Sequence, residues 1–206
     1  RELSLKMPVG SAVLAVAKCV EQMALYYNQA KSIGTLKLNT PEEYVQNYVN
    51  EYYLMDMFYR RALEAYHELV TLDIPIEIVI NEAKRQLDQE YSKMTNVMNL
   101  EWLICVKEKG EAFKNVTLEK QENFYRTEGD GTVKQVVIVS DALRYEVAKE
   151  LMQQLAKEKH IATLTPYLSM LPTETKYCKP ALLPHQSLQL AGTDMLVDGN
   201  ILTTTE

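Results

Sequence analysis

The sequence has few of the residues that build compact metal or disulfide sites. Its three cysteines, Cys19, Cys105 and Cys178, are far apart and form no CxxC pair, which argues against a structural zinc finger. An odd number of cysteines without a framework is typical of a reducing cytoplasm, so we predict a cytoplasmic protein. Three histidines are also too few for a His-rich metal site built from this chain alone.

Other absences exclude whole classes of protein. No apolar run approaches the roughly 20 residues that span a bilayer, and no signal peptide is present, so no membrane partner is expected. The sequence contains neither a P-loop nor a GxGxxG string. A net charge of -6 gives no strong positive field, so any contact with nucleic acid would need a local patch or a partner. A hydrophobic content of 47% excludes disorder as the main state.

The sequence begins at Arg1 rather than Met and ends at Glu206 with no helix cap, so we expect it to be a piece of a longer protein. A boundary inside the chain is predicted at Glu128–Thr132, where two glycines flank an aspartate between unlike patterns. This divides the chain into a helical region over residues 1–130, with long amphipathic helices, and an incomplete α/β domain over residues 131–206.

The first 130 residues show the apolar spacing of amphipathic helices. The region from Pro8 to Lys31 predicts a first helix. Thr40, Pro41 and Glu43 combine an N-cap, a proline suited to the first helical position and a carboxylate that can complete a capping box, so a second helix starts there. Its apolar a/d stripe is made of Val45, Tyr48, Tyr52, Met55, Tyr59, Ala62, Tyr66 and Leu69. Further helices are expected over about 76–106 and 118–125.

After residue 131 the pattern changes to that of an α/β fold. The β-branched run Val136–Val139 predicts a strand buried on both faces, as in a parallel sheet. A helix over about 142–158 and a second strand over 161–169 complete a βαβ unit. The predicted fold class is therefore α/β, with a helical region in front.

Two groups of side chains follow the predicted strands. Asp141 lies at the carboxyl end of the first strand, where ligands bind in open α/β sheets, but the position also suits a helix cap. Thr173 and Thr175 lie near the start of a helix predicted over about 176–183. A hydroxyl there suits a nucleophile or a bound phosphate, and again a helix cap. The residues alone leave both alternatives open.

Four strings in the second half resemble successive motifs of PglZ domains. They are VVIVSDALRYEVA at 136–148, SMLPTET at 169–175, ALLPH at 181–185 and VDG at 197–199. The preceding helices, with Phe124-Tyr125 near their end, resemble the stalk-like region of type A PglZ proteins from bacteriophage exclusion (BREX) systems. The resemblance covers nearly all of residues 40–206, and the SDALRYE string followed by LPTxT is specific.

PglZ domains belong to the alkaline phosphatase superfamily, so the resemblance implies a two-metal phosphoryl-transfer site in an alkaline phosphatase-like α/β domain. Asp141 matches the first metal-ligating carboxylate. Thr175 matches the nucleophile that also binds metal, and Thr173 is the less favoured choice. Arg144 belongs to the motif and could orient a phosphate or pair with a carboxylate. The resemblance implies two divalent ions in the full-length protein, and zinc, manganese or magnesium would suit such oxygen ligands.

The sequence departs from the superfamily in the ligands that it lacks. Further Asp and His ligands are expected later in such chains, and after Thr175 only His185, Asp194, Asp198 and Glu206 could contribute. The family pattern does not assign these as the main second-site ligands, and charge–dipole contact at a helix end is the favoured interpretation of His185. We therefore expect this piece to be inactive by itself.

Three functions remain compatible with the sequence. The first is part of a metal-dependent phosphatase or phosphodiesterase in phage defence, acting on a nucleotide or nucleic-acid phosphodiester. The second is an assembly scaffold that docks other BREX components through the Tyr/Met stripe of the helical region, because a fold alone does not establish activity. The third is a phosphate or nucleotide sensor without turnover.

Overall fold

The computed structural model describes residues 9–34, 36–72, 77–128, 134, 136–141 and 143–201. The chain divides into two compact units, Arg1–Val116 and Thr117–Glu206. The boundary predicted at residues 130 and 131 lies outside the described residues. No helix in the described part of the chain is both long and apolar enough to cross a membrane.

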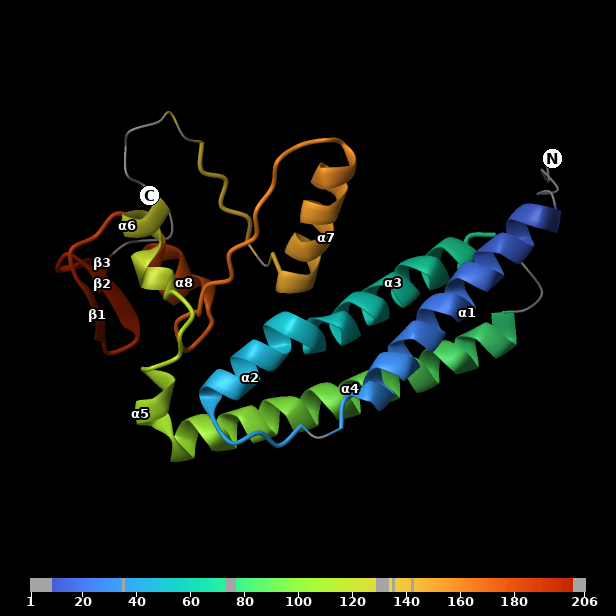
Figure 1. Cartoon of the computed structure of the whole chain (residues 1–206), viewed down its shortest axis with the longest axis horizontal. Coiled ribbons are helices and arrows are strands. Elements are labelled where there is room, and N and C mark those ends of the chain that lie inside the picture. Colours follow the sequence, from blue (N-terminus) through green and yellow to red (C-terminus); the bar gives the residue numbers. More distant parts are fainter. Residues whose placement is uncertain are drawn as a thin grey trace. The chain divides into compact units, whose positions relative to one another are not determined.

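The N-terminal unit is built from long helices that lie lengthwise in alternating directions (Figure 1). These are α1 (Val9–Ser32), a continuous helical segment from Pro41 to Val70, and α4 (Glu77–Glu108), followed by the short α5 (Gly110–Phe113). All three long helices were expected from the sequence, with bounds that differ by a few residues. The segment from Pro41 to Val70 comprises α2 (Pro41–Asn47), the π-helical turn η1 (Tyr48–Tyr52) and α3 (Tyr53–Val70).

The start of α2 confirms the predicted cap. The Thr40 hydroxyl accepts a hydrogen bond from the Glu43 backbone N–H at 3.2 Å, and Pro41 occupies the first turn. The Glu43 carboxylate accepts the backbone N–H of Asn39 at 2.8 Å, one residue before the cap. The first contact satisfies a backbone donor that an α-helix leaves without a partner, and the second joins the residue before the cap to the first turn.

The core of this unit lies between α1, α3 and α4. Tyr26, Met55 and Leu87, one from each helix, are fully buried. The predicted a/d stripe contributes Tyr52, Met55, Ala62 and Leu69 to the core, with Tyr48, Tyr59 and Tyr66 packed at its margin. The tyrosines place rings in the core and hydroxyls at its edge, as their amphipathic side chains favour.

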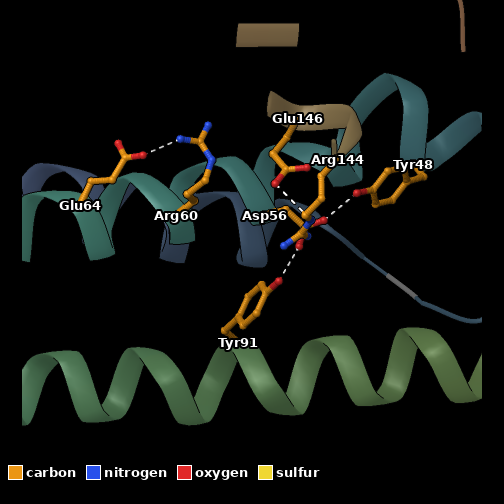
Figure 2. A network of polar contacts seen from close by, with 7 residues as sticks. All are labelled: Tyr48, Asp56, Arg60, Glu64, Tyr91, Arg144 and Glu146. Atoms are coloured by element: carbon orange, nitrogen blue, oxygen red, sulfur yellow. Dashed lines mark hydrogen bonds and ion pairs between the residues drawn. The ribbon is translucent and has the colours of Figure 1, made fainter. Parts of the chain in front are cut away.

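A buried carboxylate joins two of these helices (Figure 2). Asp56 on α3 is 4% exposed and accepts hydrogen bonds from the Tyr48 hydroxyl at 2.7 Å and the Tyr91 hydroxyl, on α4, at 2.8 Å. The Tyr91 ring also stacks on Tyr59 with centroids 3.7 Å apart. Buried charge is costly unless it is hydrogen-bonded, and the two hydroxyls meet this requirement.

The C-terminal unit contains short helices and a small sheet (Figure 1). Its helices are η2 (Gln121–Asn123), α6 (Phe124–Glu128), α7 (Tyr145–Lys157) and α8 (Thr175–Ala181). Strands β1 (Leu188–Ala191), β2 (Asp194–Val197) and β3 (Asn200–Ile201) form an antiparallel sheet in that order. The Asp198–Gly199 turn between β2 and β3 has positive φ angles of 50° and 81°, the geometry of a two-residue hairpin turn.

The strands expected at 136–139 and 161–169 are not strands in the described structure. Residues 136–139 are irregular and exposed, from 52% at Val139 to 86% at Ile138. In the 161–169 segment only Leu168 forms a bridge, parallel to Lys120. A strand buried on both faces needs neighbours on both edges, and no described strand pairs with residues 136–139. The helix between them was predicted correctly and begins at Tyr145, three residues later than expected.

Candidate functional site

The two residues predicted for the site, Asp141 and Thr175, line one cavity of the C-terminal unit. This cavity has a volume of about 630 Å³. Its wall comes from the segment before α7, the segment before α8, α8 itself and η2. The lining residues are Gln121, Val139, Ser140, Asp141, Leu143, Arg144, Ser169, Thr173, Thr175, Cys178, Lys179 and Leu182.

Asp141 and Thr175 meet in this pocket across 34 positions of the sequence. The Thr175 hydroxyl Oγ1 donates a hydrogen bond to Asp141 Oδ1 at 3.5 Å, and both side chains are exposed to the cavity's solvent. Thr173 lines the same pocket. The structure therefore brings the candidate carboxylate and the candidate hydroxyl together at one site.

Neither residue acts as the helix cap that the residues alone allowed. Helix α7 begins at Tyr145 with Arg144 as its N-cap residue, three positions after Asp141, and the cap position has no side-chain capping hydrogen bond. Helix α8 has Glu174 at its N-cap, again without a side-chain cap, and Thr175 is its first residue.

Short contacts hold the Thr175 side of the pocket in place. The Gln121 backbone N–H donates to Leu168 O at 2.9 Å, and the Leu168 N–H donates to Glu119 O at 2.7 Å. The Gln121 side chain continues to α8, where its Nε2 donates to the Cys178 carbonyl at 3.0 Å. Sequence reasoning missed Gln121, since its only signal was its place just before Phe124-Tyr125.

The pocket wall carries charges of both signs. Asp141 contributes a carboxylate, while Arg144 and Lys179 contribute cations. The Arg144 Nε lies 3.2 Å from Glu146 Oε1, the ion pair that is visible in Figure 2. Arg144 therefore pairs with a carboxylate of its own motif, one of the two roles that its place in the motif allowed. Cations beside a hydroxyl suit an anionic substrate such as a phosphate ester.

The donor set of the pocket fits part of a divalent-cation site. Two oxygen ligands of one tetrahedral cation, each at about 2.0 Å, stand about 3.3 Å apart, close to the separation of Asp141 Oδ1 and Thr175 Oγ1. Carboxylate and hydroxyl oxygens suit hard cations. Among the described residues no group of three or more His, Cys, Asp or Glu side chains could hold a metal ion. The described pocket therefore supplies some ligands and not a complete set.

Three other candidate ligands, His185, Asp194 and Asp198, are not among the residues that line this pocket. His185 Nδ1 lies 2.8 Å from the Leu183 carbonyl oxygen, a local contact after α8. Asp198 Oδ1 accepts the backbone N–H groups of Gln186 and Ser187 at 2.9 and 2.8 Å, which lower the pKa of this carboxyl below its usual value. Asp194 lies in β2, and Glu206 lies outside the described residues. Neither His185 nor Asp198 lines the pocket of Asp141.

Comparison with known proteins gives two kinds of match. Residues 120–206 match the family described as "BREX system PglZ alkaline phosphatase-like domain". An alkaline phosphatase-like protein PglZ from Bacillus cereus (strain H3081.97) is 28% identical over 155 residues, covering 72% of this chain and 18% of that protein. An alkaline phosphatase-like protein BrxZ from Escherichia coli O9:H4 (strain HS) is 53% identical over 53 residues, covering 25% of this chain and 6% of that protein.

The chain spans less than a fifth of the length of these curated relatives, at 18% and 6%. No solved structure matches it.

Proposed function

We propose that the chain contributes part of a metal-dependent phosphoryl-transfer site, because its residues 120–206 match the BREX system PglZ alkaline phosphatase-like family. Thr175 supplies the nucleophilic hydroxyl, and Asp141 supplies a carboxylate that binds a divalent cation. The observation that supports this most directly is the 3.5 Å separation of Thr175 Oγ1 and Asp141 Oδ1 in one pocket.

The residues of the pocket have different roles in the proposed reaction. Asp141 orients the Thr175 hydroxyl by accepting its hydrogen bond. A bound divalent cation, whether zinc, manganese or magnesium, would stabilise the alkoxide and offset charge on the phosphoryl oxygens. Thr175 Oγ1 forms a bond to phosphorus as the leaving alcohol departs, and water then cleaves the phosphothreonine to restore the hydroxyl. Lys179 and Arg144 attract the phosphoryl oxygens to the pocket.

The substrate class that suits this site is a phosphodiester of a nucleotide or nucleic acid. A cavity of about 630 Å³ has room for a nucleotide-sized group, and its cationic wall suits the phosphate. The wider protein would work with other BREX components in phage defence.

The test uses the full-length protein, manganese or zinc, and bis(4-nitrophenyl) phosphate. Thr175→Ala and Asp141→Ala should each lower turnover by at least about a thousandfold, because nucleophile and metal ligand act as a unit. Calorimetry with Mn²⁺ should show weaker binding for Asp141→Ala. Thr173→Ala tests whether Thr173 rather than Thr175 is the nucleophile. Thr165→Ala changes an exposed threonine outside the pocket and is the matched control. Normal turnover in both the Thr175 and Asp141 variants contradicts the proposal.

A second candidate function is assembly through the helical unit, on a face other than the Tyr/Met stripe, because that stripe packs in the core of the unit. Val97, Leu100 and Ile104 follow one another at helical spacing on α4 and are 42%, 57% and 39% exposed. An apolar stripe at this spacing suits a helix of another BREX component. Replacing Leu100 and Ile104 by Glu in the full-length protein should release such components in pull-down experiments and leave phosphodiester hydrolysis intact. Unchanged pull-down contradicts the scaffold function.

A further inference from the structure

Gln121 connects three segments that surround the Thr175 pocket. Its backbone N–H donates to the Leu168 carbonyl at 2.9 Å. Its side-chain Oε1 accepts the Met170 N–H and the Ser169 hydroxyl, both at 3.4 Å. Its Nε2 donates to the Cys178 carbonyl of α8 at 3.0 Å. Both ends of the amide are therefore in use, on two different segments.

The contact with α8 satisfies a backbone group that the helix itself leaves open. Cys178 is among the last four residues of α8, whose carbonyls have no donors within an α-helix. The residue four positions later, Leu182, instead donates its N–H to Lys179 and Pro180. The amide of Gln121 thus tethers the end of α8 to η2 from outside the helix.

This tether bears on Thr175 because α8 is short and Thr175 is its first residue. Cys178 lies one turn after Thr175 in a helix of seven residues. A rigid element of this size transmits a shift at one end to the other. The Gln121 side chain also lines the pocket that holds Thr175, so its contacts define the pocket wall on that side.

We infer that Gln121 is a positioning residue, which fixes α8 against residues 168–170 and so aims the Thr175 hydroxyl at the reacting phosphorus. This inference rests on the proposed function of Thr175. A nucleophile displaced by about 1 Å can lose on the order of a hundredfold in rate. Loss of the tether should therefore lower kcat and leave KM nearly unchanged, since the cations of the pocket wall remain.

Two substitutions in the full-length protein separate the links that Gln121 makes. Gln121→Leu removes both side-chain links. Gln121→Glu keeps an acceptor for Met170 and Ser169 but loses the donor to Cys178. Each should lower kcat for bis(4-nitrophenyl) phosphate about 10- to 100-fold per folded molecule. Gln153→Leu makes the same change at an exposed position of α7 and should leave kcat unchanged.

A double mutant distinguishes positioning from a general structural role. Once Thr175→Ala has removed the nucleophile, adding Gln121→Leu should lower the residual rate no further, because the two residues act through one step. The inference is overturned if both Gln121 variants keep kcat within about threefold of the unmodified protein while Thr175→Ala is inactive. It is also overturned if Gln121→Leu lowers the residual rate of Thr175→Ala by the same factor by which it lowers the rate of the unmodified protein. Full turnover in Thr175→Ala would instead reject the proposed function itself.

Discussion

The hydrogen bond from Tyr91 to Asp56 links α4 to α3, and Tyr91→Phe removes it while keeping the aromatic ring. The acceptor is a carboxylate that is 4% exposed, and the bond is 2.8 Å long. Hydrogen bonds to charged groups contribute about 1.5–3 kcal/mol, so we expect the free energy of unfolding to fall by about 2 kcal/mol. Urea unfolding of the 206-residue chain, followed by far-UV circular dichroism, measures this loss.

Tyr66→Phe is the matched control for this experiment. Tyr66 also joins α3 to α4, but its hydroxyl donates to the neutral Asn81 amide oxygen, at 2.7 Å, in an exposed contact. Its loss should cost less than about 1 kcal/mol. Tyr48→Phe combined with Tyr91→Phe should cost more than the sum of the single changes, since Asp56 would lose both hydroxyls. Equal losses for Tyr91→Phe and Tyr66→Phe would refute this reasoning.

Two further outcomes follow from the helical unit. Thr40→Ala removes the cap of α2 and should lower the free energy of unfolding by about 1 kcal/mol, with recovery in Thr40→Ser; an unchanged urea midpoint in the alanine variant would count against the cap. Burial, together with the hydrogen bond to Asp88, raises the pKa of Tyr59 to about 12. Because the folded pKa exceeds the unfolded value of about 10, this contribution to stability is complete below pH about 10 and is lost as the pH rises towards 12. Tyr59→Phe should therefore flatten the fall of stability with pH in that interval, as measured by urea unfolding at a series of pH values, and an identical slope would exclude this role.

The helical unit could be predicted because its signals are local. Thr40, Pro41 and Glu43 fix the start of a helix within four residues of sequence, and the a/d stripe up to Leu69 sets the buried face. The π-helical turn at Tyr48–Tyr52 could not be foreseen in this way. The hydrophobic periodicity is nearly the same on both sides of such a turn, so the a/d stripe carries no signal for it.

The C-terminal unit was harder to predict because its secondary structure depends on segments that are far apart in the sequence. The run at Val136–Val139 has the composition of a buried strand, but composition supplies no neighbouring strands. The β1–β3 sheet was missed, although the Asp198–Gly199 pair is a strong hairpin signal. The resemblance to PglZ domains paired Asp141 with Thr175 across 34 positions, whereas the residues alone only placed each group after a predicted strand and left a cap role open.

Thr175 and Asp141, on the two sides of the candidate site, are held in place by different contacts. Thr175 is fixed through α8 by Gln121, whose amide is bonded at both ends. Asp141 follows residues 136–139, which pair with no strand among the described residues and expose their β-branched side chains. A strand paired with this run would bury those side chains and fix the backbone that leads to Asp141. Because the same pairing would set the distance from Asp141 to Thr175, we expect a strand that pairs with residues 136–139 also to fix the geometry of the proposed metal site.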